Sequence, residues 1–206
     1  MPAKPSALTA TLPPLALERK VLLFSGHMID APGRHPPRFP AAMAGIATRA
    51  IADLLQAIQA GPADLAICSG ASGGDLLFDE AVLARGVPLE IFLPFPVHQF
   101  IEASVAPAGD NWVARFHKVA AQARLRLMPD ERPQAQDEAL NPYERVNLWM
   151  LEEARAGEAD RLEFICLWNG QGGDGAGGTP HMVDAVRRRG GRVHWLDTTR
   201  LWEPSP

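Results

Sequence analysis

Short apolar runs alternate along the chain with stretches in which apolar residues recur every three or four positions. The short runs are typical of strands buried on both faces of a sheet, and they cover 21–25, 65–68, 89–93, 162–168 and 193–196, with a weaker one at 125–127. The longer stretches predict helices, which cover Met43 to Ile58, 75–85, 97–122 in two pieces, 141–157 and about 180–189. A capping box is predicted at the start of 141–157, because Asn141 can cap the helix, Pro142 fits its first turn and Glu144 lies three residues after the cap.

Strands that alternate with helices imply right-handed crossovers and a mainly parallel sheet. We therefore predict an α/β protein with a three-layer Rossmann-like fold and a mainly parallel sheet of about six strands. Residues 20–206 are expected to form a single domain, and residues 1–19 a tail rich in proline and alanine.

The composition and net charge disfavour several classes of function. The 206 residues are 47% hydrophobic, which suits a packed core, and the net charge of −4 disfavours charge-driven binding to duplex DNA or a membrane surface. Neither an apolar run of about 18 residues nor a secretion-signal pattern is present, so we expect a cytoplasmic protein. We expect Cys68 and Cys166 to be reduced, buried thiols. The six histidines are scattered without zinc spacing, so no metal or cofactor is expected.

Ligands of parallel α/β sheets collect at the carboxyl ends of the strands, and three unusual segments are predicted to lie there. The first is the loop 26–40, in which Gly26, His27, Arg34 and Arg38 are candidates to contact an anion or a sugar hydroxyl. The alternative is a solvated loop that its prolines stiffen.

The second segment is the glycine-rich turn 69–74, which precedes a predicted helix. Its glycines would let backbone N–H groups approach a phosphate at the helix N-terminus, and Asp75 would accept a hydrogen bond from a ribose hydroxyl. Alternatively, Ser72 and Asp75 form a capping box with a structural role only. The candidate ligand-binding residues are Ser69, Gly70, Ser72, Gly73, Gly74 and Asp75.

The third segment, 169–179, contains six glycines in eleven residues, more than a tight turn requires. With Thr179 as helix cap and Pro180 at the first helical position, the N–H groups of His181 and Met182 would be free to bind an anion. Asp184 lies one turn further and would face the same cleft. A flexible connector is the alternative. The candidate ligand-binding residues are Gly177, Gly178, Thr179 and His181.

The aromatic residues are expected to have two different roles. Trp149, Trp168 and Trp195 fit strand or helix patterns and are predicted to be core residues, whereas Trp112 or Phe95 is a candidate for stacking on a base.

Several motifs of known enzyme classes are not found in the sequence. After the first strand the chain runs GHMIDAPG instead of GxGxxG, which disfavours a nicotinamide-dependent dehydrogenase. No nucleophile elbow or Walker loop is found.

Two segments carry a family resemblance. The stretch CSGASGGDLLFDEAVLARGVPLEIFLPFP resembles the second strand, glycine turn and helix of the SLOG superfamily, which joins the Smf/DprA and Lonely Guy families, and is closest to its YspA-like branch. The stretch AGGTPHMVDAV resembles the PGGxGTxxE signature of the Lonely Guy phosphoribohydrolases. The similarity extends over about 20–198. It implies a Rossmann-like fold that binds a nucleotide or nucleotide-derived phosphorylated ligand. The matching positions are Gly70, Gly73, Gly74 and Asp75 in the first motif and Gly177, Gly178 and Asp184 in the second.

Three functions follow from these observations. The first is a ligand-binding module that acts as a sensor. The second is an enzyme that cleaves the N-glycosidic bond of a nucleoside monophosphate, with Asp184 and Arg38 as catalytic residues. The third is an interaction domain with a degenerate site. Pro180 and His181 replace the Gly-Thr pair of the signature and Asp184 replaces its glutamate, which favours binding over catalysis.

A homodimer is also considered. Its predicted surface is the exposed side of the helix 141–157, which includes Leu148 and Trp149.

Overall fold

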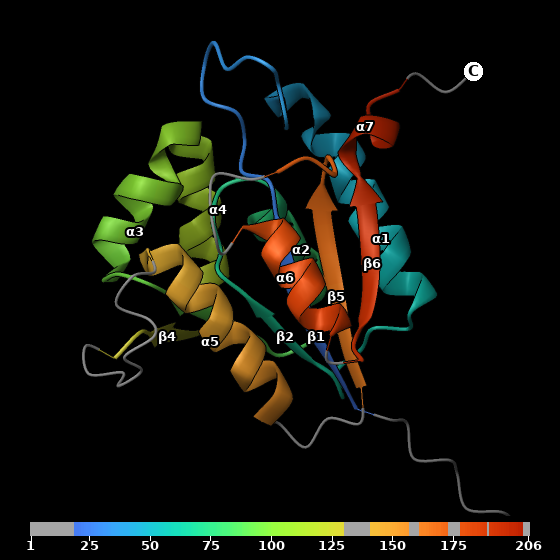
Figure 1. Cartoon of the computed structure of the whole chain (residues 1–206). Coiled ribbons are helices and arrows are strands. Elements are labelled where there is room, and N and C mark those ends of the chain that lie inside the picture. The colour runs from blue at the N-terminus through green and yellow to red at the C-terminus, as the bar shows by residue number, and fades with distance from the viewer. Residues whose placement is uncertain (1–18, 130–140, 157–160, 173–177, 189, 204–206) are drawn as a thin grey trace, which may run out of the picture.

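Six parallel strands form one sheet in the order β4-β3-β2-β1-β5-β6 (Figure 1). The structure is a computed structural model that describes residues 19–129, 141–156, 161–172, 178–188 and 190–203. Its strands are β1 (Lys20–Gly26), β2 (Leu65–Cys68), β3 (Leu89–Leu93), β4 (Arg124–Leu127), β5 (Arg161–Trp168) and β6 (Arg192–Asp197). The predicted Rossmann-like α/β class is confirmed. Most of the predicted tail and Gly177 lie outside the described residues.

Helices cover both faces of the sheet. They are α1 (Ala44–Ala57), α2 (Gly74–Leu83), α3 (Val97–Ser104), α4 (Asp110–Ala120), α5 (Pro142–Ala156), α6 (Thr179–Arg187) and α7 (Thr198–Leu201), with short 3₁₀ helices at 41–43 and 106–108. In Figure 1, α5 and α6 lie in front of the sheet and α1 and α2 behind it. No helix in the described ranges has the length and apolar character needed to cross a membrane.

The central strand β1 shows why the apolar runs are continuous. Leu22 and Phe24 belong to the apolar cluster that includes residues of α1 and α2, whereas Val21 and Leu23 belong to the cluster that includes residues of α5 and α6. All four are at most 1% exposed. Successive side chains of a strand point to opposite faces, so a strand covered on both sides needs apolar residues throughout.

The strand order determines where a crevice is expected at the edge of the sheet. From β1 the chain proceeds outward through β2 and β3 to β4, and then returns through α5 to β5 on the other side of β1. The order therefore reverses between β1 and β5, and the connections that follow these strands leave on opposite faces of the sheet. A crevice at the carboxyl ends is the expected result.

The N-terminus of α5 forms the capping box that the sequence predicts. The side-chain oxygen of Asn141 accepts hydrogen bonds from the amides of Tyr143 and Glu144, each at 3.0 Å. The Glu144 carboxylate accepts from the Asn141 amide at 2.9 Å. This reciprocal arrangement fixes the start of α5 at the carboxyl edge of the sheet.

The predicted dimer surface on α5 is wrong in one of its two residues. Trp149 is 6% exposed because its ring packs edge-on against Phe92 of β3, with a centroid distance of 4.5 Å. Its indole N–H donates to Glu153 at 3.1 Å. Leu148 is half-buried. The prediction of Trp149 as a core residue is confirmed.

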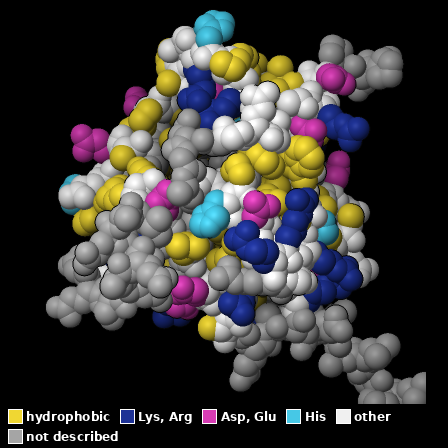
Figure 2. Space-filling model, in the orientation of Figure 1, with side chains coloured by type: hydrophobic (Ala, Val, Ile, Leu, Met, Phe, Trp, Pro, Cys, Tyr) yellow, Lys and Arg dark blue, Asp and Glu magenta, His cyan; other side chains and the backbone are white. Residues whose placement is uncertain are grey.

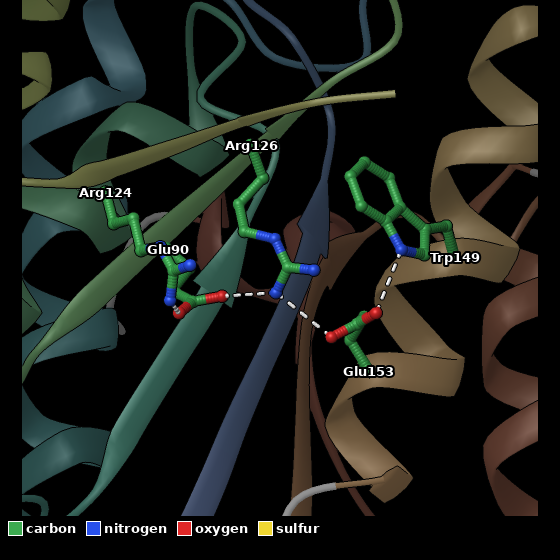
Figure 3. Close-up of polar contacts among 5 residues, drawn as sticks. All are labelled: Glu90, Arg124, Arg126, Trp149 and Glu153. Atoms are coloured by element: carbon green, nitrogen blue, oxygen red, sulfur yellow. Dashed lines mark hydrogen bonds and ion pairs between the residues drawn. The ribbon is translucent and has the colours of Figure 1, made fainter. Parts of the chain in front are cut away.

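A charged network joins the edge strand β4 to its neighbours (Figure 3). The Arg126 guanidinium donates to the carboxylates of Glu90 and Glu153, each at 3.0 Å. It also lies over the rings of Phe92 and Trp149, 4.9 and 5.2 Å from their centroids. One side chain therefore links β3, β4 and α5.

We expect Arg126→Ala to lower the free energy of unfolding by about 1–2 kcal/mol, because the variant loses two ion pairs and the cover of two aromatic rings. Arg124→Ala is the matched control, since Arg124 also pairs with Glu90 but its side chain is 73% exposed. The control should cost less than about 0.5 kcal/mol. Urea unfolding followed by circular dichroism measures both, and equal losses would contradict a special role for Arg126.

Candidate functional site

A pocket of about 420 Å³ opens at the carboxyl edge of the sheet, where β1 and β5 end. Its walls come from the loop after β1, the turn between β2 and α2, the helix α3, the first turns of α5, and the end of β5 with the start of α6. This is the crevice that the strand order predicts.

Seven of the residues singled out in the sequence line this pocket together. They are Gly26, His27, Arg38, Ser69, Asp75, Gly178 and Thr179. All three segments that were predicted to follow strand ends therefore contribute to one cavity, because parallel strands bring their carboxyl ends to the same edge.

The glycines of the turn after β2 pack against other parts of the protein and do not line the pocket. Gly73 has φ +108°, and a Cβ there would lie 2.7 Å from the amide nitrogen of Ile29 and 2.8 Å from the carbonyl oxygen of His27. The amide of Gly74 donates to the same His27 carbonyl at 3.0 Å. Gly73 is therefore required because the β1 loop and this turn approach closely.

Other amides of this turn are paired inside the protein. The Ser72 amide donates to the Ser104 carbonyl at 2.9 Å, and the Ala71 amide donates to the Asp75 carboxylate at 3.3 Å. The turn therefore shapes the pocket wall, and these donors are not available to a phosphate. The alternative of a Ser72–Asp75 capping box is also wrong, since α2 is capped by Gly73 and the Ser72 hydroxyl has no hydrogen-bond partner.

Asp75 is the carboxylate in the pocket wall. The Ser69 hydroxyl donates to it at 2.6 Å. Burial raises the pKa of Asp75 to about 6, although the hydrogen bonds from Ser69 and from the Ala71 and Gly26 amides oppose the shift. Asp75 therefore changes charge close to physiological pH.

Behind Asp75 lie two further buried groups, Asp79 and Cys68. Burial, and then the charge of Asp75, raise the pKa of the Asp79 carboxyl well above its ordinary value. Both Asp79 oxygens are buried without a hydrogen-bond partner of ordinary geometry. Burial likewise raises the pKa of the Cys68 thiol well above its ordinary value, so this thiol carries its proton at pH 7. Cys68 and Cys166 are free and buried, as predicted.

His27 is a neutral hydrogen-bond acceptor. The side chain is 8% exposed, and its Nε2 accepts from the Asn169 amide at 3.2 Å. Burial and the nearby charge of Arg38 lower the pKa of His27. Since Nε2 accepts, Nδ1 carries the proton. His27 thus ties the β1 loop to the end of β5.

The start of α6 differs from the prediction in three details. Gly178, not Thr179, is the cap, and the Met182 amide donates to the Gly178 carbonyl at 3.3 Å, so it is not free. The Thr179 hydroxyl instead pairs with the Ser25 hydroxyl at 3.2 Å. Asp184 is exposed and outside the lining, because five residues after Thr179 the helix has turned roughly 140° away.

Other predicted residues also lie outside the lining. Arg34 pairs with Asp30 within its own loop at 3.6 Å. The Nδ1 of His181 is buried without a hydrogen-bond partner. Of the residues considered for base stacking, Trp112 is 6% exposed beneath the Arg115 guanidinium, and Phe95 packs against Tyr143. The remaining predicted residues outside the lining are Gly70, Ser72, Gly73 and Gly74.

The sequence reasoning missed the contribution of α3 and α5. The Tyr143 hydroxyl and the Ser104 hydroxyl form a hydrogen bond of 3.0 Å that joins these two helices at the pocket wall. The capping signal at Asn141 located the helix start correctly, but only the strand order places it beside β1. The missed lining residues with chemical groups or aromatic rings are Ser25, Phe100, Ser104, Asn141, Tyr143, Asn147 and Trp168.

Among the described residues, the pocket is lined by hydroxyls, amides, the carboxylate of Asp75, the imidazole of His27 and the side chain of Arg38. Within the described residues no group of three histidine, cysteine or acidic side chains is arranged to hold a metal ion. Comparison of the sequence with protein-family models and with curated proteins finds no match.

Proposed function

We propose that the pocket binds a nucleotide or a nucleotide-derived phosphorylated ligand and that the protein acts as a sensor of it. The observation that carries the proposal is that hydroxyls, the Asp75 carboxylate and the Arg38 guanidinium line one cavity at the point where strand order reverses. A volume of about 420 Å³ is within the usual range for small-molecule sites.

Each part of such a ligand has a partner. The phosphate belongs at the start of α6, where the Ser25 and Thr179 hydroxyls lie and the helix dipole favours negative charge. Arg38 supplies the positive charge. Asp75, in its ionised form, accepts a hydrogen bond from a sugar hydroxyl. Because the amides near Gly73 are paired, the phosphate is assigned to one segment and not shared between two.

The resemblance to the SLOG superfamily supports the same proposal. Its two motifs contribute Asp75 and Gly178 to the lining of a single pocket, although they lie about a hundred residues apart in the sequence. The glycines of the first motif support the proposal indirectly, through the close packing that shapes the wall.

A thermal-shift titration with AMP, GMP, CMP, UMP and ribose 5-phosphate tests the proposal. At a concentration 100-fold above its dissociation constant a ligand adds about 2.7 kcal/mol of stability, so at least one compound should raise Tm by several degrees. Asp75→Asn and Arg38→Gln should each weaken binding about tenfold or more. Their matched controls, Asp53→Asn and Arg49→Gln on the exposed side of α1, should not.

The other outcomes separate the alternatives. No shift with any compound at millimolar concentration would contradict the proposal and favour an interaction domain. Appearance of free base during incubation with a nucleoside monophosphate would favour the N-glycosidase. A loss in Arg38→Gln that is larger for AMP than for adenosine would assign Arg38 to the phosphate.

A further inference from the structure

One aromatic side chain faces the pocket at the end of β5. Trp168 is half-buried and lines the cavity. Its indole N–H donates to the Gln171 carbonyl at 2.7 Å. The polar edge of the ring is therefore occupied by the protein, and the rest of the ring is apolar.

A second tryptophan holds this ring in place. Trp195 of β6 packs on Trp168 with a centroid distance of 5.8 Å and an interplanar angle of 41°. Its indole N–H donates to the Trp168 carbonyl at 2.8 Å. A Cβ on Gly170 would lie 3.0 Å from the Trp195 ring, so the turn after β5 is shaped to admit it.

The exposure of the pair is unusual for side chains of this size. Trp195 is 47% exposed, which corrects its prediction as a core residue. β6 is one of the two outer strands of the sheet, so Trp195 has a neighbouring strand on one side only. An orientation fixed by two hydrogen bonds, with apolar area left accessible, is typical of a preorganised binding surface.

The polar groups assigned to the sugar phosphate lie next to this surface. In the pairing of β1 with β5, Ser25 and Gly26 lie opposite Cys166 and Leu167, the two residues before Trp168. Ser25 in turn bonds to Thr179 at the start of α6. A polar, anion-compatible corner beside a flat apolar ring matches the two halves of a nucleotide.

The other aromatic residues of the lining are less suited to a base. Phe100 is 1% exposed and offers almost no surface. Tyr143 is 42% exposed, but it belongs to α5, and its ring contacts Phe95 edge-on. Since this ring is already in contact with Phe95, it provides the competing location in the test below.

From this arrangement we propose that the ligand carries an aromatic base and that the base stacks on the indole of Trp168. The inference rests on the proposed function and deepens it, because it distinguishes a base-bearing ligand from a bare sugar phosphate. Stacking is tolerant of base identity, so Trp168 contributes affinity for purines and pyrimidines alike.

Isothermal titration of the full chain with the four nucleoside monophosphates and with ribose 5-phosphate tests this inference. The tightest nucleotide should bind at least about tenfold more strongly than ribose 5-phosphate, and it should quench tryptophan fluorescence. Trp168→Leu should weaken the nucleotide about tenfold and leave ribose 5-phosphate unchanged. Trp168→Phe should recover most of the affinity, and Tyr143→Leu should lose little.

The unexpected results differ in which proposal they overturn. Equal affinities of nucleotide and ribose 5-phosphate overturn the stacking inference and leave the proposed function standing. A tenfold loss in Tyr143→Leu with no loss in Trp168→Leu also overturns it, by moving the base to α5. Binding of none of the five compounds overturns both proposals. Should Trp168→Leu fail to fold, the comparison of ligands on the unmodified chain and the Trp168→Phe variant still decide.

Discussion

Gly73→Ala is expected to lower the free energy of unfolding by about 3–5 kcal/mol, a large part of the stability of an ordinary domain. Two costs combine. At φ +108° an alanine is strained, and its Cβ would lie 2.7 Å from the Ile29 nitrogen and 2.8 Å from the His27 oxygen. These atoms belong to backbone, so no rotamer change relieves the contact.

Gly109→Ala is the matched control for the conformational cost alone. Gly109 has φ +103°, close to that of Gly73, but nothing lies within 4 Å of its added Cβ. We expect it to lose about 1–2 kcal/mol. Urea unfolding of both variants measures the difference, which is the cost of separating the β1 loop from the turn after β2. Losses of the same size in both would show that these two segments are not rigidly packed.

Gly73 also shows where sequence reasoning reached its limit. The pattern correctly indicated that the turn needs glycine, but a close approach to a ligand and a close approach to another backbone require the same residue. Only the position of the β1 loop, which pairs Met28 with Gly73, decides between them. That pairing joins residues 45 positions apart and leaves no local signal in the sequence.

The fold was predictable because alternating short apolar runs and amphipathic stretches permit few topologies. The edge that carries the pocket followed from the same rule, since loops after parallel strands meet at one edge. Two features depended on information that the sequence does not hold locally. Asp184 was misplaced because the side of α6 that faces the pocket is set by the packing of the helix on the sheet, and Asp184 lies about 140° around the helix from Thr179. Tyr143 was missed because its helix reaches the pocket only through the strand order.

A second large effect is expected in the pH dependence of stability, through Asp75. Its pKa is raised from 3.8 to about 6 in the folded protein, chiefly by burial. Between these values the unfolded chain has released a proton that the folded protein still holds. Stability from this group is therefore fully present below about pH 4, falls as the pH rises to about 6, and is constant above that value. A shift of about two units corresponds to about 3 kcal/mol.

The comparison of the unmodified chain with Asp75→Asn isolates this contribution, because carboxylates with lowered pKa values change stability in the opposite direction and are shared by both proteins. From pH 4 to pH 8 the unmodified chain should lose about 3 kcal/mol relative to Asp75→Asn, measured by urea unfolding at each pH. The exposed Asp53→Asn variant on α1 should run parallel to the unmodified chain. If the difference in the free energy of unfolding between the unmodified chain and Asp75→Asn stays constant with pH, Asp75 does not titrate in this range. In that case Asp75 would not have to release a proton in order to accept a hydrogen bond from a sugar hydroxyl. If the difference does change as expected, ligand binding through the ionised Asp75 must itself strengthen as the pH rises through about 6, since the bound form selects the carboxylate that burial disfavours.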